Sequence, residues 1–149
     1  MSHHFLLIIH LICAAVWIGG HLYLSVSLLP KALKRKEPQH LLQFAHGYEP
    51  LGMPALLLLV VTGIWMSLQF GIGWQQWFSF SSPVERVVSL KLTLLFATLL
   101  LALNAQFRVV PALKNNAARL PEMAFHIIAV TLIGITMLVL GSFIRYGGL

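Results

Sequence analysis

Charged side chains are scarce in this 149-residue chain: only 9% of its residues are Asp, Glu, Lys or Arg, whereas 58% are hydrophobic. Soluble domains carry about 25% charged residues, so this chain has too few of them to cover itself with a hydrated surface. The same shortage excludes intrinsic disorder, which needs low hydrophobicity and high charge. The composition predicts an integral membrane protein.

Acidic residues are rarer still, with four Asp and Glu against ten Lys and Arg and a formal net charge of +6. Such an excess of positive charge is typical of nucleic-acid binders when it forms a dense patch. Here the basic residues are few and lie in the gaps between long apolar runs. We therefore exclude nucleic acid as a partner and expect the lipid bilayer instead.

Cysteine is almost absent as well, since Cys13 stands alone. An intrachain disulfide is excluded, and so is a zinc site built on paired cysteines. A single cysteine inside an apolar run is most often a small buried packing residue. No internal repeat or low-complexity tract is visible, so we expect residues 1–149 to form a single integral membrane domain.

Four long apolar runs cover residues 5–29, 51–70, 84–107 and 123–144. Each is long enough to cross about 30 Å of hydrocarbon, which takes about 20 helical residues. Lipid cannot satisfy open backbone polar groups, so helices are expected. Unbroken stretches such as residues 56–61 lack the alternation of β-barrel strands. The predicted fold class is all-α, an antiparallel bundle of four transmembrane helices.

Proline and capping residues mark the ends of these runs. Residues 82–85 form a Ser-x-x-Glu capping box with proline at the first helical position, which predicts the start of the third helix. Pro121 predicts the start of the fourth helix, whereas Pro30 and Pro111 are expected to end the first and third. The first run lacks a basic start and is too long for a cleaved signal peptide.

Basic residues are absent from the loop at residues 71–82, which instead holds an aromatic belt of Trp74, Trp77, Phe78 and Phe80. They gather after the first and third runs, at Lys31, Lys34, Arg35, Lys36, Arg108, Lys114 and Arg119. The positive-inside rule places both basic loops in the cytoplasm and both termini outside. The expected location is a bacterial-type cytoplasmic (inner) membrane.

Ionisable residues within membrane spans are costly and mark candidate functional sites. The chain has His10, His21, His126 and Lys91 within its spans, with His46 and Glu49 at the cytoplasmic edge. His10 and His21 are 11 residues apart, about three helical turns plus 20°, so they share one helix face.

These residues are predicted to lie in two polar layers. The helical rise of 1.5 Å per residue puts His10 and Lys91 in the outer half of the bilayer, and His21 and His126 in the inner half near His46. Neutral imidazoles on facing helices can ligate haem iron or copper. The Lys91 ammonium is expected to meet an anion, such as a haem propionate or an acidic substrate.

Small residues and methionines allow two interpretations each. Gly19 and Gly20 open a gap beside Trp17, so Trp17 and Gly20 are expected to line a flat cofactor, with plain helix contact as the alternative. Thioethers select Cu(I), but the methionines, including Met53 and Met123, form no MxxxM run and are interpreted mostly as core packing.

Several motifs resemble a known family. His10, residues 17–20, the Glu-Pro-Leu-Gly stretch at 49–52 and the Thr-Gly-Ile-Trp stretch at 62–65 resemble the copper-resistance D (CopD-like) membrane domain. The Leu-Lys-Leu element at residues 90–92 and the four-helix layout are similar to the related HemJ-type protoporphyrinogen oxidases. The resemblance covers nearly the whole chain.

Each resemblance implies a function. Similarity to CopD-like proteins implies passage or handling of copper across the inner membrane, with the transmembrane histidines as candidate ligands. Similarity to HemJ-type proteins implies a b-type haem on His10, with Lys91 near the tetrapyrrole. His21, His46 and His126 depart from the HemJ pattern and favour a haem or metal site in the inner layer.

Three functions are therefore weighed. The leading hypothesis is a redox protein, or a membrane haem oxidoreductase, that binds haem b between His21 and His126 or His46 and exchanges electrons with a quinone or redox protein. The alternative is copper transport or resistance through His10, His21 and nearby methionines. A third reading is a structural or assembly subunit. A homodimer is one expected assembly, and the catalytic residues stay unassigned.

Overall fold

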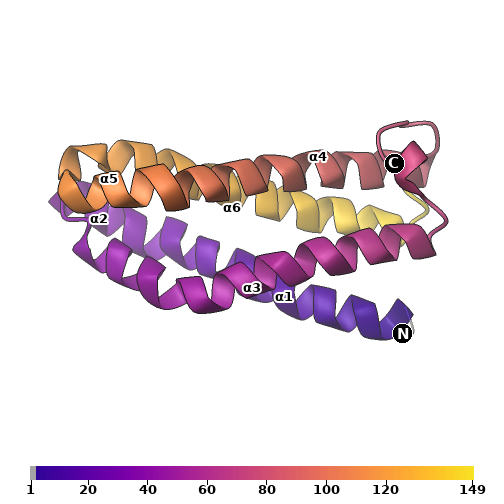
Figure 1. Cartoon of the computed structure of the whole chain (residues 1–149), viewed down its shortest axis with the longest axis horizontal. Coiled ribbons are helices and arrows are strands. Elements are labelled where there is room, and N and C mark those ends of the chain that lie inside the picture. The colour runs from indigo at the N-terminus through magenta and orange to yellow at the C-terminus, as the bar shows by residue number, and fades with distance from the viewer. Residues whose placement is uncertain (1–2) are drawn as a thin grey trace.

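The computed structural model describes residues 3–149, and all regular structure in that range is helical. Four helical rods are long and apolar enough to cross a membrane. Figure 1 shows them running along the long axis of the molecule, with both chain ends at the end opposite α2 and α5. The prediction of an all-α fold with four membrane-spanning helices is confirmed.

The first rod passes through a proline without ending. It consists of α1 (His3–Tyr23), the π turn η1 (Leu24–Leu28) and α2 (Leu29–Arg35). The prediction that Pro30 ends this helix is wrong. A proline inside a regular α-helix removes a hydrogen bond and clashes with the carbonyl four residues earlier. The π turn changes the hydrogen-bond register just before Pro30, so the proline lies at the first positions of α2, where it is tolerated.

The third rod repeats this arrangement. It consists of α4 (Pro83–Asn104), the π turn η3 (Ala105–Val109) and α5 (Val110–Asn115), with Pro111 at the start of α5. The prediction that Pro111 ends the helix is therefore wrong for the same physical reason.

The second and fourth rods are unbroken α-helices. The second, α3 (Gln39–Gln69), keeps its helical form through Pro50 and Pro54 and begins well before the apolar run at 51–70. The fourth, α6 (Leu120–Ile144), follows the short 3-10 turn η4 (Ala117–Arg119).

The loop between α3 and α4 contains the 3-10 turn η2 (Trp74–Gln76) and ends in the predicted capping box. The Glu85 N–H donates to Ser82 Oγ at 3.3 Å, and the Glu85 carboxylate accepts the Ser82 N–H at 3.3 Å. These two bonds satisfy donors that the first turn of α4 would otherwise leave open.

The rods pack as two pairs, α1 with α3 and α4 with α6, and the contact of α1 with α6 joins the pairs. One buried cluster lies at the end of the molecule that holds α2 and α5: Leu24, Leu29, Ala32, Leu41, Val109, Leu113, Leu120, Met123, Ala124 and Ile127. A second lies between the pairs: Ala14, Trp17, Ile18, Leu56 and Val130.

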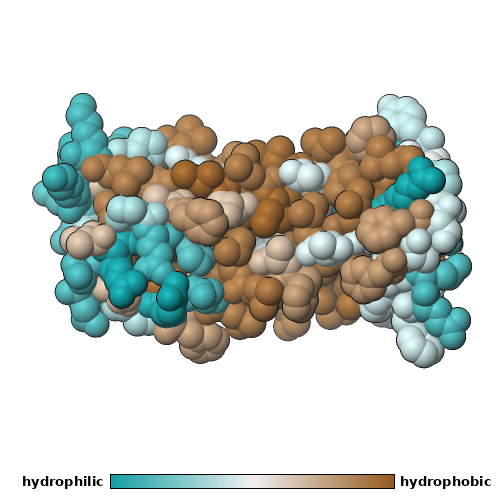
Figure 2. Space-filling model, turned by 90° about the horizontal axis from the view of Figure 1, so that it is seen from above, coloured by the Kyte–Doolittle hydropathy of each residue, from teal (hydrophilic) through white to brown (hydrophobic). Residues whose placement is uncertain are grey.

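The surface matches a membrane location. Large hydrophobic side chains are exposed, including Phe107 at 77% and Val26 at 75%. Figure 2 shows hydrophobic side chains across the middle of one face of the molecule, with hydrophilic side chains at both ends of that face. We call the end that holds α2 and α5 the basic end, because both basic loops lie there. The chain is a multi-pass membrane protein.

Candidate functional site

A cavity of about 110 Å³ lies between the rods toward the basic end, and all four rods contribute to its lining. Both π turns border it, through Leu24 on the first rod and Ala105 and Gln106 on the third. We call it the histidine cavity. Its polar, aromatic and sulfur-bearing lining residues are Trp17, His21, Tyr48, Glu49, Met53, Gln106, Met123 and His126.

The two histidines of this cavity have the same hydrogen-bond pattern. His21 Nδ1 lies 2.9 Å from the Trp17 carbonyl oxygen, and His126 Nδ1 lies 2.9 Å from the Glu122 carbonyl oxygen. A carbonyl only accepts, so Nδ1 carries the proton in both neutral rings and Nε2 keeps its lone pair. Metal-ligating histidines typically donate their other ring N–H in this way. The structure thus brings together two ligand-competent imidazoles from α1 and α6.

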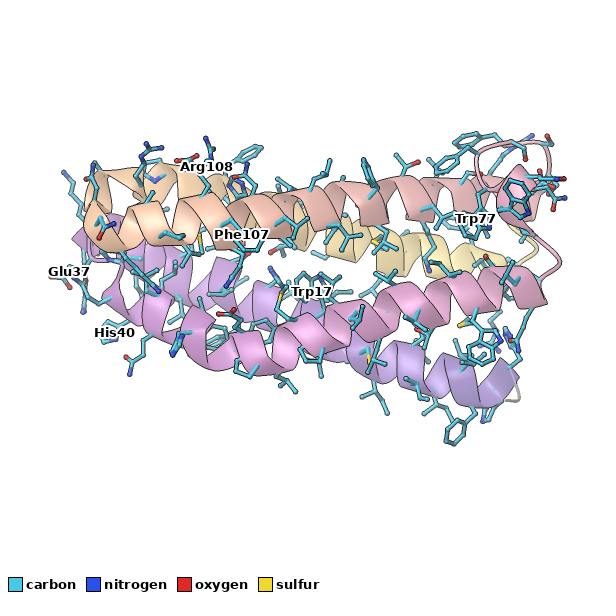
Figure 3. All side chains as sticks on the ribbon, viewed as in Figure 1. Trp17, Glu37, His40, Trp77, Phe107 and Arg108 are labelled. Atoms are coloured by element: carbon cyan, nitrogen blue, oxygen red, sulfur yellow. The ribbon has the colours of Figure 1, made fainter. Side chains whose placement is uncertain are left out.

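The gap at Gly20 is filled by a tyrosine. A Cβ on Gly20 would overlap the ring of Tyr48, and a Cβ on Gly52 would lie 2.5 Å from it. The Tyr48 hydroxyl donates to main-chain carbonyls of α1, and its ring meets that of His21 edge-on at 6.1 Å. Trp17 packs on the other side of His21, with ring centroids 4.4 Å apart. Figure 3 shows Trp17 in the space between the helices.

A carboxylate and an amide form the polar wall of the cavity. Gln106 Nε2 donates to Glu49 Oε1 at 2.6 Å and so links α3 to the π turn η3. Buried carboxylates need hydrogen-bond or ionic partners. Within residues 3–149 no cation forms an ion pair with Glu49. The Glu49 carboxylate therefore provides negative charge that favours a cation in the cavity.

Two methionines add sulfur donors to the same lining. Met53 comes from α3 and Met123 from α6, and Met123 is also part of the buried cluster at the basic end. Soft thioethers select Cu(I), and imidazoles also suit copper. The interpretation as core packing agrees with the burial of Met123, whereas Met53 is exposed. Both residues also line the histidine cavity.

His10 lies apart from this cavity, on the half of α1 nearer the N-terminus. Its Nδ1 is 2.8 Å from Thr62 Oγ1, and the Thr62 hydroxyl donates its own proton to the Leu58 carbonyl oxygen at 2.6 Å. The Thr62 oxygen therefore accepts from His10, whose Nε2 is left with its lone pair. His10 is thus oriented as a ligand in the same way as His21 and His126.

Lys91 and His46 complete the set of predicted site residues. Lys91 is half-buried, its Nζ lies 3.4 Å from the Cβ position of Gly141 on α6, and its charge acts on His10. His46 is exposed on α3 and does not line the histidine cavity. The structure thus brings together His21 and His126 on one level and His10 and Lys91 on another, without His46.

The residues that line the histidine cavity do not fit a haem. Pockets for drug-sized ligands measure about 300–1,000 Å³, whereas the histidine cavity has about 110 Å³. The space that Gly20 was expected to leave for a flat cofactor holds the Tyr48 ring. The predicted pairing of His21 with His46 also lacks a shared cavity, because His46 lies outside.

The histidine cavity is not a closed metal cage either. Across residues 3–149, no group of three or more His, Cys, Asp and Glu side chains is placed to hold a metal ion. Two imidazole-bearing and two thioether-bearing residues line the histidine cavity instead.

Three polar residues of the cavity lining were not among the predicted site residues: Tyr48, Glu49 and Gln106. Glu49 was noted as an ionisable residue at the edge of a span and as part of the Glu-Pro-Leu-Gly stretch, but without a role in the site. Gln106 carries a signal in the sequence, since it is a polar residue within the run at 84–107. Tyr48 carries none, because its role depends on Gly20 of another helix.

One known protein family matches most of the chain. Residues 42–144 match the family model described as copper resistance protein D. No curated protein and no solved structure matches the chain. The matched range contains Glu49, Met53, Lys91 and His126, and it covers well over half of the 149 residues. The chain therefore belongs to the copper resistance protein D family.

Proposed function

We propose that this protein takes copper into the histidine cavity as cargo and passes it across the membrane. One observation carries the proposal: His21 and His126, each with Nδ1 bonded to a main-chain carbonyl, line one cavity of a four-helix bundle together with Met53 and Met123. Imidazole and thioether together are a donor set that suits copper and not the hard cations, which prefer oxygen. The family match supports the same metal.

Weak ligation suits transport. An ion that crosses a membrane has to bind well enough to enter each site and weakly enough to leave it. The absence of a third His, Cys, Asp or Glu ligand among residues 3–149 fits a passing ion better than a resident one. Glu49 supplies charge to the cavity while its bond to Gln106 holds the carboxylate in place.

His10 provides a second binding position for the ion on α1, which we call the His10 station. It lies 11 residues before His21, which is about 16 Å along the axis. Thr62 holds its ring with Nε2 available. The positive charge of Lys91 weakens the binding of a cation at His10 by repulsion, which speeds release. Two stations at different heights are the arrangement that conduction requires.

The direction of passage rests on the predicted topology. We propose that the basic end faces the cytoplasm of an inner membrane, because Lys and Arg gather there. The His10 station then lies nearer the outside and the histidine cavity nearer the cytoplasm.

The test is a Cu(I) titration of the purified protein in detergent against a competing chelator. We expect His21→Ala and His126→Ala each to weaken binding by about tenfold or more, since even second-shell changes at metal sites cost 10–100-fold. His46→Ala is the matched control, because His46 is exposed outside the cavity, and it should bind as the unaltered protein does. Unchanged binding in both cavity variants would refute the copper site and favour an assembly role.

A further inference from the structure

A second, larger cavity of about 530 Å³ lies at the basic end, between the first rod and the start of α3. It shares no lining residue with the histidine cavity. We call it the basic pocket. The residues that matter for its chemistry are Tyr23, Lys31, Arg35, His40, Gln43 and Phe44. Figure 3 shows His40 near this end of the molecule.

Lys31 and Arg35 are neighbouring cations in the lining of the basic pocket, and neither is paired with the acidic residue of that lining. Lys31 and Arg35 are one helical turn apart on α2, and like charges at this spacing repel. Glu37 is the one acidic residue of the lining, and it is exposed. Among the described residues, neither Lys31 nor Arg35 forms an ion pair. A bound anion would remove this repulsion.

Two arginines of the other basic segment are paired within the chain. Arg108 and Arg119 both form ion pairs with Glu122 at the start of α6. These arginines are thus satisfied within the chain, whereas the cations of α2 remain available to an external group. The difference points to a ligand at the basic pocket specifically.

Another part of the pocket wall is aromatic and apolar. The rings of Tyr23 and Phe44 lie 5.1 Å apart, and Leu28 borders the same space. The volume falls in the range of about 300–1,000 Å³ that is usual for small-molecule sites. A ligand that suits both walls carries a negative charge at one end and hydrocarbon at the other. Basic pockets between transmembrane helices on the cytoplasmic side bind phospholipid headgroups.

We propose that the basic pocket binds the headgroup phosphate of an anionic phospholipid. The Arg35 guanidinium offers a fork of N–H donors that matches two phosphate oxygens, and the Lys31 ammonium adds a point charge. The start of the acyl chains lies against Tyr23, Leu28 and Phe44. Lysine and arginine have no lone pair for a metal, so this site is separate from the copper path.

Native mass spectrometry of the delipidated protein in detergent tests the proposal. We expect added phosphatidylglycerol, which is anionic, to be retained by the protein, and phosphatidylcholine, which is zwitterionic, to be lost. Lys31→Gln with Arg35→Gln should weaken phosphatidylglycerol binding about tenfold or more, since hydrogen bonds to charged groups are strong. The control Lys114→Gln removes one cation from the same end outside the pocket and should retain the lipid.

Two further arms make the outcome decisive. Inorganic phosphate at equal concentration should not displace the lipid; displacement would assign the site to a soluble phosphate compound. Arg35→Lys keeps the positive charge and should retain part of the phosphatidylglycerol binding. This variant supplies the test if the double variant folds poorly. Equal retention of both lipids, or full retention by the double variant, would overturn the proposal. Copper is absent from every arm, so the result is independent of the proposed transport.

Discussion

At the scale of single residues, Tyr48 determines the shape of the histidine cavity. Its ring lies against the backbones at Gly20 and Gly52, and its hydroxyl donates to carbonyls of α1. The same ring stacks on Phe44, with centroids 5.6 Å apart. Tyr48 lines the histidine cavity and Phe44 lines the basic pocket, so these stacked rings link the two walls. The Tyr48 ring also limits the space beside His21.

Gly20→Ala is expected to destabilise the protein by about 1–3 kcal/mol, the usual cost of overpacking a filled site. The added methyl group would overlap the Tyr48 ring. Gly19→Ala is the matched control, because nothing lies within 4 Å of its Cβ position; we expect it to stabilise the helix by about 0.5–1 kcal/mol. Thermal unfolding in detergent measures both.

The cost of Gly20→Ala should largely disappear in a Tyr48→Ala background, since contacting residues show non-additive effects. An undiminished cost in the double variant would mean that Gly20 acts through something other than the tyrosine ring.

Thr62→Val tests the orientation of His10. The change removes the oxygen that accepts from His10 Nδ1, and loss of such an outer-shell partner lowers metal affinity by about 10–100-fold. We expect the second copper equivalent, at the His10 station, to bind that much more weakly. Thr136→Val removes a comparable hydroxyl on the exposed face of α6. Equal copper titrations of the two variants would argue against a station at His10.

The sequence was informative about the histidines and much less so about their surroundings. His10, His21 and His126 could be chosen because ionisable residues inside membrane spans are rare. Nothing in the sequence shows that Tyr48 would fill the gap at Gly20, because that contact depends on how α1 and α3 pack. The expectation of a haem assumed that the gap at Gly20 is open, whereas the Tyr48 ring fills it.

At the scale of elements, the two π turns are the feature that positions the site. Each begins six residues before a proline, η1 before Pro30 and η3 before Pro111. Single π turns inside helices are frequent at functional sites. Here η3 places Gln106 beside Glu49. Proline in the sequence predicted a helix end at both places. A proline alone does not show whether the helix ends there or continues after a change of hydrogen-bond register.

The capping box at α4 was fully predictable, because it involves only neighbouring residues. Ser82→Ala should lower the stability by about 1 kcal/mol, the typical cost of losing an N-cap. Ser81→Ala is the control: its backbone N–H still reaches Glu85, and its hydroxyl is not part of the box. If thermal unfolding gave the same midpoint for both variants, the cap would not contribute to stability.

At the scale of the whole molecule, hydropathy alone was sufficient to predict four membrane spans. It did not predict that the spans pack as two pairs, which only the structure shows. Figure 1 shows both chain ends opposite the basic end. Charge asymmetry between the ends predicts that the basic end is cytoplasmic.

Cysteine labelling from outside the cell tests this topology. In a Cys13→Ala background, Ser79→Cys and Tyr146→Cys should react with a membrane-impermeant maleimide in intact cells. Lys34→Cys and Lys114→Cys should react only after the membrane is permeabilised. All four positions are exposed in the structure. The reverse pattern would invert the proposed topology and the direction of copper passage.

The most direct measurement is X-ray absorption spectroscopy of the purified protein loaded with Cu(I). Nitrogen scattering with the multiple-scattering pattern of imidazole, together with sulfur scattering from methionine, is the predicted result. In a His10→Ala background, which removes the second station, His21→Ala with His126→Ala should abolish the imidazole pattern. Copper bound without imidazole, or an unchanged spectrum in the double variant, would contradict the copper site between α1 and α6.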